Sequence, residues 1–204
     1  MATQVKTVHR LKVTLREVRP PVWRRIEVAS NIKLSELSGV LEAAMGWLGG
    51  HLHAFEAGGV IYEIPDGESF GFPPPRDERK ARLGEVLPAV KSKMRWDYDF
   101  GDGWEHDVVV EAIEPMSSDG AYPFCIAGKR ACPPDDCGGP WGYSNLLVAI
   151  SDPTHEEYEE LTEWLPPGFD ADAFDIAEAT EMMRSTRPLR GVNGARAVRR
   201  CPDQ

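Results

Sequence analysis

The side chains of this chain that could do chemistry gather first in the stretch 96–111, where acidic residues alternate with aromatic and β-branched ones. Gly101, Asp102 and Gly103 interrupt the pattern, so the stretch predicts a β-hairpin in which Phe100 pairs with Trp104. Because strand side chains alternate between faces, one face should be apolar and the other acidic. The predicted apolar face carries Trp96, Tyr98, Phe100, Trp104, His106, Val108 and Val110.

The acidic face needs a source of positive charge or open water. In the predicted register Asp99 faces Glu105 and Asp97 faces Asp107, and like charges opposite one another repel. A hard cation such as Mg²⁺, Mn²⁺ or Ca²⁺ would suit these carboxylates. Solvation, or pairing with arginines, is the plainer interpretation of a charged strand face. The arginines considered for this pairing are Arg24, Arg25 and Arg95.

Two histidines raise a second metal hypothesis. His51 and His53 are two residues apart on a predicted strand, so they should share a face and could hold one ion. His106 could converge with them, and Asp102 or Cys132 could complete the ligand set. The alternative is that His53 and His106 are core histidines with ordinary hydrogen-bond partners, because most histidines bind no metal.

The sharpest expectation places His53, Asp102 and His106 close together, with Tyr98, at one end of the sheet. His106 lies on the predicted apolar face opposite Tyr98, and a single core would bring the His53 face to the same place. Buried polar groups need partners, since burial without one costs roughly 1–3 kcal/mol. Mutual contact or a shared ion would supply them.

Three cysteines offer a weaker metal site. Cys125, Cys132 and Cys137 have six and four residues between them, whereas structural zinc sites usually contain close pairs and four ligands. A fourth ligand would have to come from His106, a distant histidine or Cys201. Buried structural thiols, or a thiol nucleophile near His106, are the alternatives.

These hypotheses define the candidate residues, while catalytic residues stay unassigned. The candidate site comprises His51, His53, Tyr98, Asp99, Asp102, Glu105, His106, Arg24 and Arg25. The candidate metal ligands are His53, Asp102, His106, Cys125, Cys132 and Cys137, and the cofactor they suggest is a divalent metal, Zn²⁺ or Mg²⁺/Mn²⁺.

The elements that must position these residues follow from periodicity. Alternation of apolar and polar residues predicts strands at 5–17, 23–29, 51–55 and 60–64, besides the hairpin. Helical spacing predicts a helix between residue 34 and Gly46, a turn of helix at 83–87, and helices at 143–150, 155–165 and 172–184. The segments 65–79 and 122–142 are predicted as irregular.

Charge and hydropathy limit the class of protein. The net charge is −10, so the body should repel nucleic acid, and direct binding is expected only through a basic tail after residue 186. No apolar run approaches the roughly 20 residues of a membrane span, and no signal peptide is evident at the N-terminus. We therefore expect a cytoplasmic protein without a membrane partner, whose cysteines are thiols or metal ligands.

Four stretches of the chain form a recognisable combination. They are Pro20-Pro-Val-Trp-Arg-Arg-Ile26; Met45-Gly-Trp47 with His51-Leu-His-Ala-Phe55; the segment from Tyr98 to His106; and Gly128 with the segments 132–139 and 142–143. Together they resemble the plasmid pRiA4b ORF-3-like family. Asp135 departs from the family, which usually has Glu there. The resemblance implies an α+β fold with an antiparallel-type sheet and packed helices, and it implies no known activity.

We therefore expect one α+β domain at 1–186 and a basic, disordered tail at 187–204. The domain should contain a mainly antiparallel sheet of about five or more strands, packed helices and a mostly helical C-terminal third. Some family members are described as passenger proteins of insertion elements or as resolvases, but no serine in a resolvase context occurs here. The favoured function is a non-enzymatic protein-binding domain associated with mobile-element or plasmid genes. The alternative is a metal-dependent hydrolase or nuclease-like enzyme built around the Tyr98–His106 hairpin.

Overall fold

An eight-stranded mixed sheet forms the centre of the computed structural model, which describes residues 6–65, 74–118 and 120–186. The strand order is β5-β4-β3-β6-β7-β1-β2-β8; β4 and β5 are parallel and the other neighbours antiparallel. The strands are β1 (Thr7–Leu15), β2 (Trp23–Ala29), β3 (His53–Ala57), β4 (Val60–Glu63), β5 (Arg76–Asp77), β6 (Lys93–Tyr98), β7 (Trp104–Pro115) and β8 (Phe124–Lys129).

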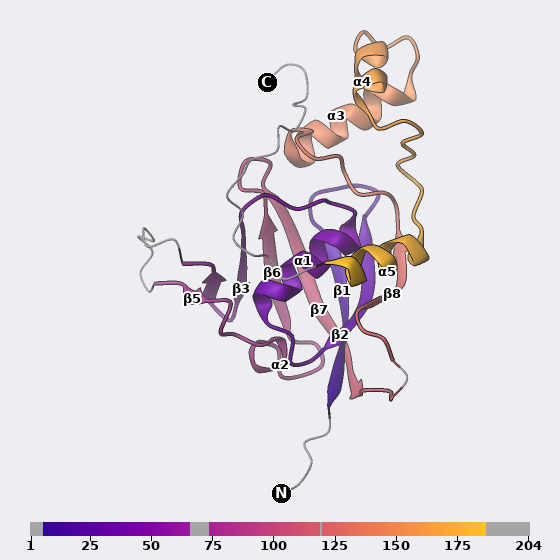
Figure 1. Ribbon diagram of the computed structural model, residues 1–204. Coiled ribbons are helices and arrows are strands. Elements are labelled where there is room, and N and C mark those ends of the chain that lie inside the picture. The colour runs from indigo at the N-terminus through magenta and orange to yellow at the C-terminus, as the bar shows by residue number, and fades with distance from the viewer. Residues whose placement is uncertain (1–5, 66–73, 119, 187–204) are drawn as a thin grey trace, which may run out of the picture.

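Five helices complete the described part of the chain. They are α1 (Leu34–Met45), α2 (Leu83–Val86), α3 (Gly139–Ser151), α4 (Tyr158–Trp164) and α5 (Ile176–Ser185). Helices α1 and α5 contact each other across one face of the sheet, whereas α3 and α4 lie beyond the end at which β6 and β7 are joined (Figure 1). No helix among these residues is long and apolar enough to cross a membrane.

The contact between β2 and α1 explains how the main helix is fixed on the sheet. Leu34, Leu37 and Leu41 recur at helical spacing and are completely buried. The last carbonyls of a helix lack intrahelical partners. Arg24 of β2 supplies the missing hydrogen-bond donors, because its guanidinium donates to the carbonyl oxygens of Ala44 (2.8 Å) and Met45 (3.1 Å).

The predicted hairpin forms with a different register. Tyr98, not Phe100, pairs with Trp104, so the connecting loop comprises residues 99–103. Asp99 adopts a left-handed backbone conformation (φ 53°), and its carbonyl oxygen accepts a hydrogen bond from the N–H of Gly103. The loop therefore begins two residues earlier than the glycines suggested. Phe100 leaves the predicted apolar face and is 57% exposed.

The new register also changes which acids face one another. Asp97 lies opposite Glu105 and Asp107 lies opposite Arg95, so the predicted pairs of facing acids do not form. Arg95 contacts both Asp97 (2.8 Å) and Glu56 (2.9 Å). Arginines thus provide positive charge on this side of the sheet.

The expectation of a mostly helical C-terminal third is wrong. Helices make up only 27% of the described residues, and α3, α4 and α5, with 13, 7 and 10 residues, are separated by irregular segments. The segment 122–142, predicted as irregular, contains β8, which pairs with the outer edge of β2. Its Pro, Gly and Cys content obscured the strand. The predicted tail 187–204 and most of the predicted loop 65–79 lie outside the described residues.

Candidate functional site

Three irregular segments meet where β6 ends and β7 begins, and we call their meeting place the three-loop junction. It consists of residues 47–52, which precede β3, the hairpin loop 99–103, and residues 132–139, which lead into α3. The Trp47 indole N–H donates to the carbonyl oxygen of Pro133 (3.0 Å). The Asp99 N–H donates to the carbonyl oxygen of Leu52 (2.9 Å). Both bonds hold the segments together.

The third side of the junction is closed by Asp102. The backbone N–H groups of Gly138 and Gly139 donate to its carboxylate. Burial nevertheless raises the pKa of Asp102 above its ordinary value, and the Asp99 and Asp136 carboxylates add to the effect. Its Oδ2 is buried and has no hydrogen-bond partner among the described residues.

A histidine and two aspartates lie at the centre of the junction. His51 Nδ1 is 3.1 Å from Asp99 Oδ2, and Asp136 completes a group whose ligand atoms all lie within 4.8 Å of one another. Asp99 and Asp136 both have left-handed backbones (φ 53° and 56°), a conformation that aspartate tolerates better than most residues. Asp99 Oδ1 also accepts the N–H of Gly101 (3.0 Å), which fixes the carboxylate in the turn.

Tyr98 and Trp47 form the floor beneath this group. The two rings stack with centroids 4.7 Å apart, and the His51 ring meets Tyr98 edge-on at 5.6 Å. Tyr98 is only 1% exposed, and its hydroxyl has no hydrogen-bond partner among the described residues. Burial, reinforced by the Asp135 carboxylate, raises the pKa of Tyr98, so the phenol stays protonated.

Asp135 adds further negative charge. Burial and the Asp136, Asp99 and Asp102 carboxylates raise the pKa of Asp135 to about 6, while His51 opposes the shift. Four carboxylates therefore share a partly buried space with one imidazole. Such a site favours a bound cation or the basic side chain of a ligand, because either would relieve the repulsion.

The structure separates the predicted metal ligands His53 and His106. His53 pairs with Tyr98 of β6, and His106 pairs with Trp96 of β6, not with Tyr98 as predicted. Because Tyr98 and Trp96 are two residues apart on one strand, both histidine rings project from the same face of the sheet. His53 Nε2 contacts both carboxylate oxygens of buried Glu78 at 3.1 Å. His106 Nδ1 bonds to the carbonyl oxygen of Trp96 (3.2 Å), and burial lowers the pKa of His106 to about 3. The two imidazole rings therefore have different hydrogen-bond partners and do not form the predicted metal site together.

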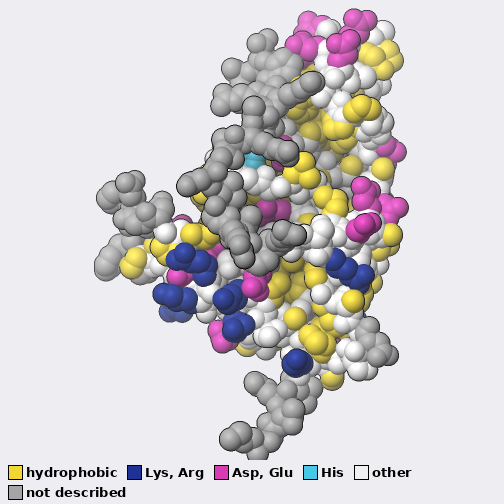
Figure 2. All heavy atoms as spheres, in the orientation of Figure 1, with side chains coloured by type: hydrophobic (Ala, Val, Ile, Leu, Met, Phe, Trp, Pro, Cys, Tyr) yellow, Lys and Arg dark blue, Asp and Glu magenta, His cyan; other side chains and the backbone are white. Residues whose placement is uncertain are grey.

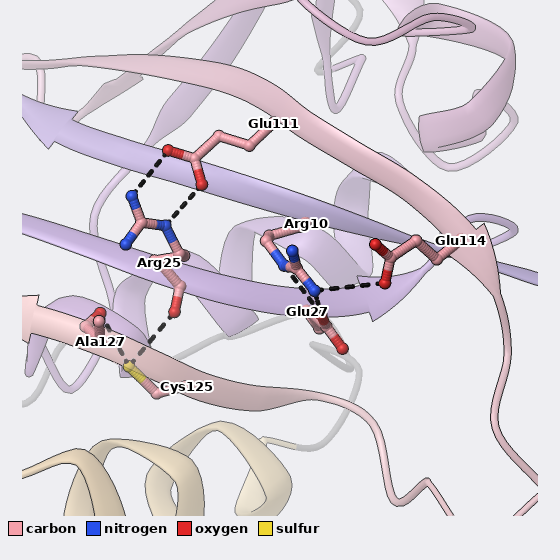
Figure 3. A network of polar contacts seen from close by, with 7 residues as sticks. All are labelled: Arg10, Arg25, Glu27, Glu111, Glu114, Cys125 and Ala127. Atoms are coloured by element: carbon pink, nitrogen blue, oxygen red, sulfur yellow. Dashed lines mark hydrogen bonds and ion pairs between the residues drawn. The ribbon is translucent and has the colours of Figure 1, made fainter.

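The cysteines do not assemble a ligand set within the described residues. There, the group of three potential ligands that come within 4.8 Å consists of His51, Asp99 and Asp136. The Cys125 thiol donates to the carbonyl oxygens of Arg25 and Ala127 (Figure 3). Burial raises the pKa of the Cys125 and Cys132 thiols, which disfavours a thiolate nucleophile. Cys201 lies outside the described residues.

The remaining candidates, Arg24, Arg25 and Glu105, have structural partners. Arg24 is 1% exposed and stacks on the Phe174 ring at 3.9 Å while it caps α1. Arg25 forms a two-bonded pair with Glu111 at 2.5 and 2.9 Å (Figure 3), and Glu105 pairs with Arg16. The hydrogen bonds and ion pairs of these three residues hold the strands and α1 in place.

Sequence reasoning missed Asp135 and Asp136 as site residues. It also missed a rim of exposed apolar side chains, contributed by two parts of the junction, residues 47–52 and the hairpin loop 99–103, and by the first turn of α3. The rim comprises Leu48, Leu52, Phe100 and Trp141, which are 88%, 74%, 57% and 82% exposed. The available signal was the position of acids and large apolar residues within glycine- and proline-rich segments.

Comparison with known proteins gives the chain its relatives. The sequence model described as plasmid pRiA4b ORF-3-like protein matches residues 7–178. The chain is 42% identical over 161 residues to the uncharacterized protein y4hQ of Sinorhizobium fredii. The aligned residues cover 78% of this chain and 81% of the relative. It is also similar to the crystal structure of MM3350, a protein of unknown function from Methanosarcina mazei. That match has a TM-score of 0.76 and 35% identity and covers 86% of this chain and 98% of the other.

Proposed function

The chain belongs to the plasmid pRiA4b ORF-3-like family, and on that premise we propose that it is a non-enzymatic protein-binding domain of the cytoplasm, associated with plasmid or mobile-element genes. Its binding surface is the three-loop junction. Stretches from the second, third and fourth parts of the family resemblance build this junction, and the first part supplies Arg24, which caps the helix that leads into Trp47.

The observation that carries the proposal is the apolar rim around an acidic centre. Leu48 and Leu52 come from residues 47–52, Phe100 comes from the hairpin loop and Trp141 from the first turn of α3, and all four are largely exposed. Large apolar side chains gathered on a surface and bordered by polar groups are typical of interaction sites. Tryptophan and other aromatic residues also dominate the binding energy of many protein interfaces.

The charge at the centre specifies the partner. Asp99, Asp102, Asp135 and Asp136 are held together with His51 as their basic neighbour at the junction. A protein segment that presents a lysine or arginine between apolar side chains complements both the acids and the rim. On the face drawn in Figure 2, acidic side chains also lie at the α4 end, whereas basic ones gather near β5 and α2. The α3–α4 end of the molecule is therefore the end that attracts a basic partner.

Selection of random displayed peptides on the full-length chain tests this function. We expect selected peptides to share one basic residue flanked by apolar residues. Trp141→Ser and Leu52→Ser should each weaken the binding of a synthetic selected peptide by about tenfold or more. Ile61→Ser is the matched control, because Ile61 is 46% exposed on β4, and it should leave peptide affinity unchanged.

Two outcomes would overturn the protein-binding proposal. One is a selection that yields no common basic-apolar pattern. The other is a set of selected peptides that binds Trp141→Ser as tightly as the unaltered chain. Circular dichroism of each variant shows that its fold is retained, so a loss of binding can be assigned to the surface.

A metal-dependent hydrolase or nuclease-like enzyme is the second candidate function. The observation that favours it is the His51–Asp99–Asp136 group, because carboxylate- and imidazole-bound ions activate water in many hydrolases. Its test is hydrolysis of p-nitrophenyl phosphate and of a short DNA duplex in the presence of Mn²⁺. Hydrolysis that requires the ion and is lost in Asp99→Asn would favour the enzyme over the binding domain.

A further inference from the structure

The junction contains three potential metal ligands in one place, although the ligands predicted from the sequence were largely different ones. His51 Nδ1 and Asp99 Oδ2 are 3.1 Å apart, and an Asp136 oxygen completes a set within 4.8 Å. Neighbouring ligands of one ion bound at roughly 2.0–2.2 Å stand about 3 Å apart, so the His51–Asp99 spacing is suitable. An ordinary ion pair between these two residues would explain their spacing but not the rest of the site.

A buried hydroxyl provides an independent indication of a ligand. The Tyr98 side chain is 1% exposed, and its hydroxyl has no hydrogen-bond partner among the described residues. The Asp135, Glu42 and Asp99 carboxylates are close enough to act on the hydroxyl electrostatically, and the Tyr98 ring contacts His51, so the hydroxyl lies beside the junction. Buried hydroxyls are normally satisfied, so an unsatisfied one at this position requires an explanation. Water bound to an ion would supply the missing hydrogen bond.

The charge of the site is consistent with the same ligand. Within the junction, His51 faces Asp99, Asp135 and Asp136, and Asp102 is close enough to add to their repulsion. A dication would neutralise two of the four carboxylates and leave the other two for a basic group. One imidazole nitrogen with two carboxylate oxygens is a donor set for Mn²⁺ or Zn²⁺, whereas Ca²⁺ and Mg²⁺ prefer oxygen alone.

We propose that His51, Asp99 and Asp136 bind one divalent transition-metal cation, such as Mn²⁺ or Zn²⁺, and that the Tyr98 hydroxyl hydrogen-bonds to a water in its coordination shell. The site does not depend on the proposed partner, because the isolated full-length chain should bind the ion. Tyr98 is a positioning residue here, since it touches the shell and not the ion.

Isothermal titration of metal-free protein with MnCl₂ tests the site. Mn²⁺ is the probe because cysteine sulfur elsewhere in the chain would attract Zn²⁺ more strongly than Mn²⁺. We expect one ion per chain, with affinity lowered at least about tenfold in Asp99→Asn and in Asp136→Asn. Asparagine keeps an oxygen to accept the Gly101 N–H and tolerates the left-handed backbone, so both variants should fold.

Two further variants separate a coordination site from a general effect of charge. Tyr98→Phe leaves the charge and the stacked ring in place, and it should lower Mn²⁺ affinity by about tenfold. His155→Gln removes a histidine that lies beside Asp152, outside the junction, and it should leave affinity unchanged. The proposal fails if millimolar Mn²⁺ produces no binding, or if Asp99→Asn binds Mn²⁺ as tightly as the unaltered chain. Neither result would decide the protein-binding proposal, which the peptide selection tests independently.

Discussion

The backbone carbonyl of Asp102 occupies the place where a side chain on Gly139 would begin. Gly139 has a positive φ of 67°, and a Cβ atom built on it would overlap the Asp102 oxygen. The tip of the hairpin therefore seats directly on the start of α3. This close approach positions two of the three segments that form the three-loop junction.

Gly139→Ala is expected to destabilise the protein strongly. The left-handed backbone costs a residue with a side chain roughly 1–2 kcal/mol, and the overlap adds roughly 1–3 kcal/mol. Gly168→Ala is the matched control, since Gly168 also has a positive φ but has no atom within 4 Å of the position that a Cβ would occupy. Urea unfolding of both variants checks the difference. Equal losses of stability would show that the hairpin tip does not seat on α3.

Trp104→Ala should cost roughly 3–5 kcal/mol of unfolding free energy, as large aromatic truncations in cores do. Trp104 is 1% exposed and packs near Trp47, with ring centroids 5.9 Å apart. Phe100→Ala, four residues away in the same hairpin, should cost far less because Phe100 is exposed. Chemical denaturation compares the two. A larger loss for Phe100→Ala would restore the register in which Phe100 faces the core.

Arg24→Met is expected to destabilise the protein by roughly 2–4 kcal/mol. The change removes the donors that satisfy the carbonyls at the end of α1, and buried carbonyls left without a partner cost roughly 1–3 kcal/mol each. Arg25→Met on the same strand should cost about 1 kcal/mol or less, since its pair with Glu111 is about one-third exposed. Thermal unfolding separates them. A small effect at Arg24 would mean that α1 needs no cap from β2.

His106 should make the protein less stable as the pH falls. Its pKa is about 3 in the folded chain against an ordinary value of 6.5, so the unfolded chain binds the extra proton first. Protonation of His106 therefore does not lower the free energy of unfolding above pH 6.5. Between pH 6.5 and pH 3 it lowers that free energy by up to about 1.4 kcal/mol per pH unit. Burial also lowers the pKa of His9, which acts in the same direction.

Urea unfolding at pH 7 and pH 5 measures this dependence. His106→Gln should reduce the loss of stability between the two pH values, whatever its effect at either one. An unaltered difference in the variant would show that His106 is not the residue responsible.

Periodicity alone predicted most of the elements near the site, because alternation and helical spacing are local properties. β2 and α1 begin and end close to their predicted bounds for this reason. The hairpin register was wrong because the left-handed Asp99, which starts the loop, looks in sequence like any strand residue. β8 was missed because its pairing with β2, a long-range contact, stabilises a segment with little β pattern of its own.

The candidate site was predicted in part. His51, Tyr98, Asp99 and Asp102 were named from the sequence, and all four lie at the junction. The predicted metal ligands His53 and His106 do not share a site, because His53 contacts Glu78, which is distant in sequence and could not be identified as its partner from the local pattern. Asp136 was overlooked because the fold of an irregular segment decides where its side chains point, and no periodic pattern encodes that fold.

Anomalous diffraction from crystals of the full-length chain grown with Mn²⁺ tests most directly whether the three-loop junction is a binding site. We predict one strong anomalous peak within bonding distance of His51, Asp99 and Asp136, with the Tyr98 hydroxyl beside it. Peaks found only at other positions, or no peak at the junction in crystals saturated with Mn²⁺, would contradict the account.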